Sequence, residues 1–118
     1  MPLILRKAAR ETDGDTVWHI MKPAIEAGET FCADPGGGKA GGLAYFWPPT
    51  AQVWIAEADG AALGCCYLRP NQTGNGAHVC NAGYCTAPDA RGKGIARAML
   101  DHTLTEARRQ GYRAMQYN

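Results

Sequence analysis

The chain has 118 residues, of which 46% are hydrophobic and 19% are charged, and its formal net charge is +1. These proportions are typical of a soluble globular protein, and the length suits a single domain over residues 1–118. Twelve basic residues nearly balance eleven acidic ones. That balance argues against nucleic-acid binding, which usually requires a strong basic excess. No apolar run is long enough for a membrane span.

The five cysteines form no CxxC pair, and two of them are adjacent, which suits neither an ordinary disulfide nor a zinc site. We interpret them as reduced thiols that serve as small apolar residues. The apolar run before Arg6 is too short for a signal peptide, so we expect a cytoplasmic protein. The cysteines are Cys32, Cys65, Cys66, Cys80 and Cys85.

The first element is a strand over residues 3–9. A helix follows, which Thr12 or Asp13 caps and which runs to about Ala27. Pro23 predicts a kink or break in this helix near Lys22, because proline removes a backbone donor. Apolar residues at helical spacing predict the buried face, which contains Val17, Ile20, Met21, Ala24 and Ile25.

Residues 28–50 form the least regular part, with five glycines in the seven residues from 36 to 42. Gly36, Gly38 and Gly41 match the GxGxxG spacing. We reject a nucleotide site there, because no apolar strand precedes the glycines and Pro48-Pro49 prevents a long helix. A mobile loop is expected instead. Residues 45–47, Tyr-Phe-Trp, either pack on the core or line a substrate mouth, and packing is favoured.

Three strands are predicted next, over residues 52–57, 61–68 and 77–86, with Asp59-Gly60 as the tight turn between the first two. Gly83, in the third strand, suits a bulge or a close ligand. An amphipathic helix follows over residues 92–110, and Gly111 is the expected residue after its end. Residues 112–117 begin a last strand.

Residues 84–99 read YCTAPDARGKGIARAM, a strand that enters a helix through a glycine-rich turn. The first N–H groups of a helix have no intrahelical partner and bind anions readily. Gly92 and Gly94 would let a phosphate approach the backbone, and Arg91 and Lys93 add positive charge. The P-loop and dinucleotide patterns do not fit, because Gly94 follows Lys93 and Arg97 occupies the third glycine position.

The pattern R-x-x-G-x-A at Arg91, Gly94 and Ala96, preceded by a strand and a proline turn, resembles the acetyl-CoA signature of the GCN5-related N-acetyltransferase (GNAT) superfamily. The predicted element order also resembles that fold. The resemblance implies an α/β (α+β) fold with a mixed central sheet flanked by helices. That fold normally continues past its fifth strand, where this chain stops. We therefore expect a truncated or proteolysed product, or a domain completed by another polypeptide.

The resemblance also assigns a cofactor site. The end of the fourth strand would pair its backbone with the pantetheine arm of acetyl-CoA and polarise the thioester carbonyl. The glycine turn would hold the pyrophosphate. The residues that match these positions are Tyr84, Cys85, Thr86, Arg91, Gly92, Lys93, Gly94, Ile95 and Ala96.

The implied reaction is direct acetyl transfer to an amine, which requires a base. His78 and Glu29 are weak candidates for this base. The plainer interpretation of His78 is a partly exposed strand residue, and that of Glu29 is a solvated loop carboxylate. Cys85 as an acetylated nucleophile is less favoured than Cys85 as a core thiol. The frequent general acid of the family is a tyrosine beyond the fifth strand, and Tyr112 and Tyr117 are too early to be that residue.

The leading hypothesis is therefore an N-acetyltransferase that uses acetyl-CoA and acetylates a primary amine of a small molecule or peptide. The alternatives are a non-catalytic acyl-CoA-binding or regulatory module, and a fragment inactive without its C-terminal part. We expect no metal, because the three histidines are scattered and His19 and His102 are placed on exposed helix faces. A homodimer is left open.

Overall fold

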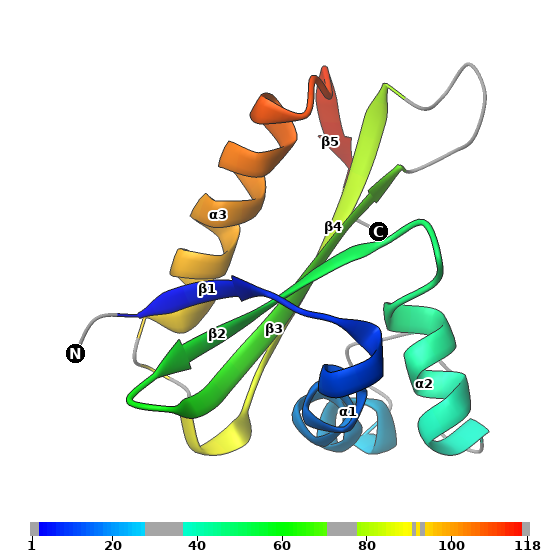
Figure 1. Ribbon diagram of the computed structural model, residues 1–118, viewed down its shortest axis with the longest axis vertical. Helices are drawn as coiled ribbons and strands as arrows, with labels where there is room; N and C mark the ends of the chain where they lie inside the picture. The colour runs from blue at the N-terminus through cyan, green and yellow to red at the C-terminus, as the bar shows by residue number, and fades with distance from the viewer. Residues whose placement is uncertain (1–2, 28–36, 71–77, 91, 93, 117–118) are drawn as a thin grey trace.

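The computed structural model describes residues 3–27, 37–70, 78–90, 92 and 94–116. In these residues a five-stranded sheet has the order β1-β2-β3-β4-β5, with α1 and α2 on one face and α3 on the other (Figure 1). The elements are β1 (Ile4–Lys7), α1 (Arg10–Ala27), α2 (Gly38–Phe46), β2 (Gln52–Ala58), β3 (Ala61–Pro70), β4 (Val79–Thr86), α3 (Ile95–Arg109) and β5 (Ala114–Gln116).

The sheet is mixed, as the sequence predicts. β1, β2, β3 and β4 pair antiparallel in chain order, and β4 and β5 pair parallel after the crossover through α3. The β2–β3 hairpin turns at Asp59-Gly60, where φ is 51° and 79°. Positive φ at both positions matches the twist of the flanking strands and confirms the predicted tight turn.

Alternating side chains of the strands divide the core into two clusters, one on each face of the sheet. Under α1 and α2 the sheet contributes Val53, Ile55, Cys65, Tyr67 and Cys85, which pack against helix residues such as Val17, Met21 and Phe46. Under α3 it contributes Trp54, Ala56, Cys66, Leu68, Cys80 and Ala82, which pack against Ile95 and Met99. Both clusters contain residues of β4, so the strand that leads into the glycine turn is anchored from both sides.

Helix α1 begins at Arg10, two residues before the earlier of the two predicted caps. Asp13 lies inside the first turn and accepts the Ala9 backbone N–H at 2.8 Å and two N–H groups of the Arg6 guanidinium at 3.0 Å each. Of the predicted kink or break near Lys22, the break is wrong, because the helix runs through Pro23 to Ala27. Buried side chains on both sides of the proline hold the two halves against the same core.

Helix α2 corrects the prediction of a mobile loop for residues 38–46. Gly42 is buried, and a Cβ there would lie 2.4 Å from Cζ3 of the Trp18 ring. The glycine therefore lets α2 approach α1, and this packing offsets the poor helix propensity of glycine. Phe46 and Trp47 are buried, which confirms the packing interpretation for both. The helix ends before Pro48, as the two prolines require.

The structure also tests the predictions for the ends of the last helix, for Gly83 and for His102. Helix α3 starts at Ile95 rather than Gly92 and ends at Arg109. Gly111 follows the helix end as predicted, and the next N–H, that of Tyr112, donates to the Ala107 carbonyl at 3.0 Å. Gly83 forms no bulge in the regular β3–β4 register. His102 is half-buried and packs edge-on against Trp54, with ring centroids 4.9 Å apart. The prediction of an exposed His102 was therefore wrong, because Trp54 covers one side of α3.

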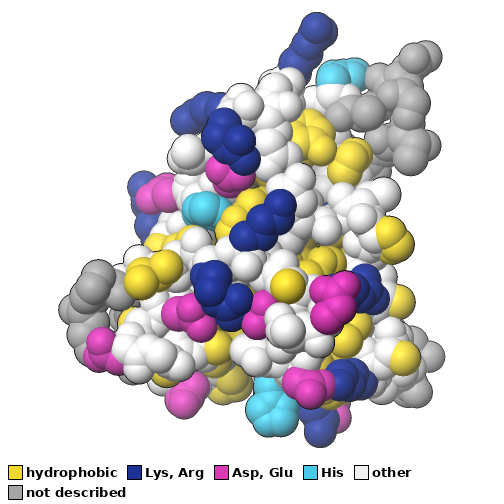
Figure 2. All heavy atoms as spheres, viewed as in Figure 1, with side chains coloured by type: hydrophobic (Ala, Val, Ile, Leu, Met, Phe, Trp, Pro, Cys, Tyr) yellow, Lys and Arg dark blue, Asp and Glu magenta, His cyan; other side chains and the backbone are white. Residues whose placement is uncertain are grey.

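Over the residues that the structure describes, no helix combines the length and apolar character needed to cross a membrane, and no group of His, Cys, Asp and Glu side chains could hold a metal ion. On the face drawn in Figure 2, acidic and basic side chains are intermixed.

Candidate functional site

The connection from β4 to α3 is a chain of short turns. Strand β4 ends at Thr86, a 3₁₀ turn follows at Pro88–Ala90, and α3 begins at Ile95. Gly92 and Gly94 have φ angles of 82° and 77°, which side chains with a Cβ rarely adopt. The two glycines therefore permit the chain to turn directly into the helix.

A hollow of about 270 Å³ lies at this connection. It brings together five of the nine predicted cofactor residues, from the end of β4 and the start of α3. The lining consists of Thr86, Ala90, Gly92, Gly94, Ile95, Ala96 and Arg97. The predicted residues Arg91 and Lys93 lie outside the described residues.

The hollow has the electrostatic character of an anion site. The N-terminus of α3 opens into it, and no side chain among the described residues caps that helix end. Arg97 adds a guanidinium at the edge, which the exposed carboxylate of Asp101 partly balances at 3.3 Å. On sequence alone, Arg97 counted as the residue that breaks the dinucleotide pattern and was not placed at the site. Its position one turn after Gly94 was the available signal.

Close packing holds the start of α3 against the sheet. A Cβ at Gly64 of β3 would lie 3.0 Å from the carbonyl oxygen of Cys85 and 3.1 Å from Ile95 Cγ2. The Ala87 N–H also donates to the Leu63 carbonyl at 2.8 Å. These contacts fix the helix N-terminus relative to the end of β4.

The side chains of Tyr84 and Cys85 point to opposite faces of the sheet, each into the core cluster on its own face. The Tyr84 hydroxyl hydrogen-bonds Thr103 Oγ1 of α3 at 2.7 Å, and the Cys85 thiol points at the Ile20 carbonyl of α1 at 3.5 Å. Neither side chain reaches the hollow. This placement is compatible with the predicted role of both residues through their backbone, which stays a prediction.

Strands β4 and β5 pair only from Val79 to Asn81 in the described residues, so residues 82–86 of β4 lie beyond this pairing. Asn81 is the last paired position and is buried. Its amide Nδ2 donates to the Gln116 carbonyl at 2.8 Å, and its Oδ1 accepts the Tyr67 hydroxyl at 3.0 Å. A network thus connects β3, β4 and β5 where the pairing ends. No local sequence pattern indicated this network, because its partners lie on two other strands.

The acetyltransferase (GNAT) family model matches residues 18–118, which is most of the chain and includes the whole of this site. The chain belongs to the acetyltransferase (GNAT) family. The structure of a GCN5-related N-acetyltransferase from Kribbella flavida is similar with a TM-score of 0.87 and 32% identity, and the match covers 98% of this chain and 71% of that one.

Two further similar proteins are acetyltransferases by name. The yncA protein of Salmonella typhimurium, solved with its cofactor acetyl-CoA, has a TM-score of 0.82 at 21% identity, covering 99% of this chain and 69% of that one. The N-acetyltransferase aca1 of Schizosaccharomyces pombe is 38% identical over 56 residues, which are 48% of this chain and 27% of that relative. The chain therefore matches about a quarter of the curated relative.

Of the two candidates for a catalytic base, only His78 lies in the described residues, and it is not brought to the hollow. His78 is exposed and lies just before β4, where its carbonyl accepts the Arg113 N–H at 2.9 Å. It precedes Tyr84 by six residues, about 20 Å along an extended strand. Glu29 lies outside the described residues.

The described cysteines are free thiols in the core, which confirms the interpretation for four of the five. Burial raises the pKa of Cys66 to about 12 and also raises the pKa of Cys65 and of Cys80. These thiols are therefore protonated and unreactive at neutral pH. Cys85 is equally part of the core, and Cys32 lies outside the described residues.

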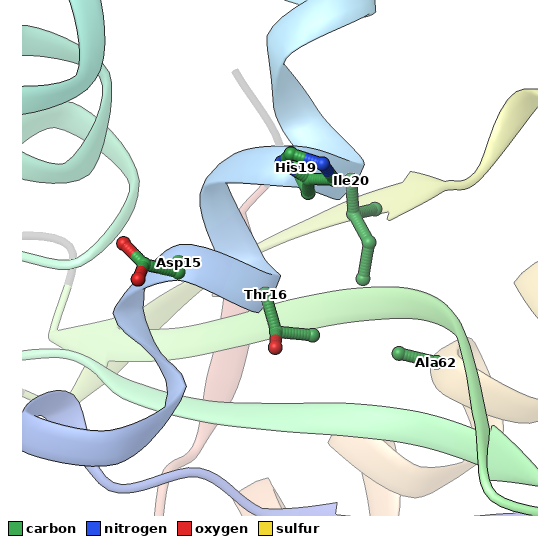
Figure 3. A pocket seen from close by; sticks show the side chains of 5 residues that line it. All are labelled: Asp15, Thr16, His19, Ile20 and Ala62. Carbon is green, nitrogen blue, oxygen red and sulfur yellow. The ribbon is translucent and has the colours of Figure 1, made fainter.

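A second hollow, of about 300 Å³, lies between α1 and the start of β3. Figure 3 shows Thr16 and Ile20 of α1 pointing toward Ala62, with His19 on the helix above and Asp15 to one side. Asp15 forms an ion pair with Lys39 of α2. None of the predicted site residues lines this hollow.

Proposed function

We propose that this chain is an acetyl-CoA-dependent N-acetyltransferase. The observation that carries the proposal is the hollow lined by Thr86 of β4, by Gly92 and Gly94, and by the start of α3. An uncapped helix N-terminus, two glycines and Arg97 suit a pyrophosphate there. The 38% identity to an N-acetyltransferase over 56 residues supports nitrogen as the acceptor atom.

In this proposal the pantetheine arm follows β4 toward the place where the β4–β5 pairing ends. Backbone N–H groups of residues 84–86 would polarise the thioester carbonyl. A neutral primary amine of a small molecule or peptide attacks the carbonyl carbon and forms a C–N bond. The C–S bond then breaks, and CoA leaves as a thiolate that takes up a proton. The proton lost by the amine passes to water.

The first test is ligand-dependent stability of the intact protein. Acetyl-CoA is expected to raise the melting temperature, because a ligand that binds only the folded state stabilises it. Gly94→Glu should abolish the rise, since it puts a carboxylate and a strained backbone where the pyrophosphate would lie. Gly111→Glu is the matched control: its φ is 87°, but it lies at the other end of α3.

The second test separates catalysis from binding. Release of free CoA thiol should depend on an added amine, and mass spectrometry should find the acetylated amine. A rise in melting temperature without transfer to any amine in a broad panel would favour a binding module instead. Absence of any acetyl-CoA effect would reject the proposal, as would a rise that Gly94→Glu retains in full.

A further inference from the structure

Three polar or charged side chains, those of Tyr67, Arg69 and Asn81, gather on the α1–α2 face of the sheet where the β4–β5 pairing ends. Tyr67 and Arg69 of β3 lie directly opposite Gly83 and Asn81 of β4. Because side chains alternate along a strand, these positions share one face. Tyr67 belongs to the core cluster under α1 and α2, which identifies that face.

Tyr67 is held in place by its neighbours. Its ring contacts the Phe46 ring edge-on, with centroids 4.9 Å apart and an interplanar angle of 89°. Its hydroxyl donates to Asn81, whose amide in turn donates to β5. Gly83 leaves the room for the ring. The ring is therefore a rigid floor that lies across the part of β4 beyond the β5 pairing.

The Arg69 guanidinium lies over the Tyr67 ring. Its guanidinium carbon is 4.9 Å from the centroid of the Tyr67 ring, and Nη1 donates to the Tyr45 carbonyl at 3.3 Å. Among the residues that the structure describes, no carboxylate forms an ion pair with Arg69. A guanidinium stacked on a ring keeps its edge donors available, and their fork matches a carboxylate. The half-buried cation thus has binding capacity that the described residues do not use.

On the opposite face, the residues that the structure describes include no comparable cation at this level of the sheet. There the Tyr84 hydroxyl is bonded to Thr103 of α3, and Cys80 and Ala82 belong to the apolar cluster under that helix. An acceptor that carries charge would therefore approach β4 from the α1–α2 face, over Tyr67 and past Arg69.

We propose that Arg69, stacked on Tyr67, binds the carboxylate of the acceptor, and that the acceptor is a small amino acid-type molecule with a free amine and a free carboxylate. The carboxylate on Arg69 would direct the neighbouring amine toward β4. This inference rests on the proposed function and narrows its acceptor from any primary amine to an amine with a nearby anionic group.

The experiment compares matched acceptors with the intact protein and acetyl-CoA. A panel of amino acids is assayed beside the carboxamides of the same amino acids, which keep the amine and lose the negative charge. The best acid should exceed its amide in kcat/KM by about tenfold to a hundredfold, the range for one charge-assisted bidentate contact. Peptides with a free N-terminus and an amidated C-terminus should be as poor as the amides.

Variants then test the residue. Arg69→Gln should raise KM for the acid by a similar factor, leave kcat and KM for the amide nearly unchanged, and leave KM for acetyl-CoA unchanged. Arg69→Lys should restore part of the preference, because it keeps the charge but loses the fork. Arg108→Gln, an exposed arginine near the end of α3, is the control for the loss of one positive charge and should keep the full preference.

The outcomes separate the two proposals. Equal rates for acids and amides, or equal losses for both in Arg69→Gln, would overturn the inference and leave the acetyltransferase function standing. Acetylation of no amine at all would overturn the proposed function and this inference with it. The wild-type comparison of acid with amide decides the question even if an Arg69 variant fails to fold.

Discussion

Gly83 of β4 lies directly opposite Tyr67 of β3, and a Cβ at Gly83 would stand 2.3 Å from Cε2 of the Tyr67 ring. No real Cβ comes that close to a carbon atom, so the ring can lie across β4 only because residue 83 is glycine. The same placement brings the Tyr67 hydroxyl to Asn81 and the Arg69 guanidinium over the ring.

Gly83→Ala is expected to displace the Tyr67 ring and to lower the free energy of unfolding by about 1–3 kcal/mol, the usual effect of overpacking. Urea denaturation followed by fluorescence measures this loss. In a Tyr67→Ala background the same substitution should cost much less, because the clashing ring is gone. An equal loss in both backgrounds would show that a side chain at residue 83 does not clash with the Tyr67 ring.

Gly42→Ala is expected to destabilise the protein, because the new Cβ would lie 2.4 Å from the Trp18 ring and would push α2 away from α1. The loss in the free energy of unfolding should again be about 1–3 kcal/mol. Gly41→Ala, in the same helix, is the control: its Cβ meets nothing within 4 Å. That variant should be neutral or gain up to about 1 kcal/mol from helix propensity. Thermal unfolding of the two variants in parallel measures this difference. A lower melting temperature for Gly41→Ala than for Gly42→Ala would contradict this packing.

Asp13 should make stability depend on acid pH. Hydrogen bonds from the Arg6 guanidinium, and then from the Ala9 N–H, hold the pKa of Asp13 below its ordinary value. A lowered folded-state pKa means that the stabilisation is present above the ordinary pKa, near 4, and is lost as the pH falls through the folded value.

Asp13→Asn should therefore reduce the free energy of unfolding by about 1–3 kcal/mol at pH 7 and by progressively less below about pH 4. Chemical denaturation at a series of pH values measures the difference. Asp101→Asn removes an exposed partner of Arg97 and should change stability by less than about 0.5 kcal/mol. A difference for Asp13→Asn that stays constant down to pH 2 would contradict the assigned linkage.

The core thiols should resist alkylation while the protein is folded. At pH 8 a thiol with a pKa near 12, such as Cys66, is a thiolate in roughly one molecule in ten thousand. Peptide mapping after iodoacetamide treatment should find Cys65, Cys66 and Cys80 unmodified in native protein and modified in urea. Rapid modification of Cys66 without unfolding would contradict its buried environment.

Local rules explain what the sequence predicted well. The Asp59-Gly60 turn, the glycine turn before α3 and the stop at Gly111 each depend on a few neighbouring residues whose backbone preferences are strong. The mixed sheet was implied by the resemblance of the predicted element order to the GNAT fold, and the observed order of the elements agrees with it.

Tertiary contacts explain what the sequence did not predict. Gly42 is required because the Trp18 ring of α1 occupies the space that a side chain there would need. Gly83 forms no bulge, and the Tyr67 ring leaves no room for a side chain at that position. Both partners lie many residues away, so no local pattern shows them. The same holds for the polar network at Asn81, whose two partners come from β3 and β5.

Calorimetric titration of acetyl-CoA into the intact protein tests the central claim most directly. The account predicts saturable binding at one site per chain, lost in Gly94→Glu and retained in Gly111→Glu. Binding that is unchanged by Gly94→Glu, or no binding by the unmodified protein, would contradict a cofactor site between the end of β4 and the start of α3.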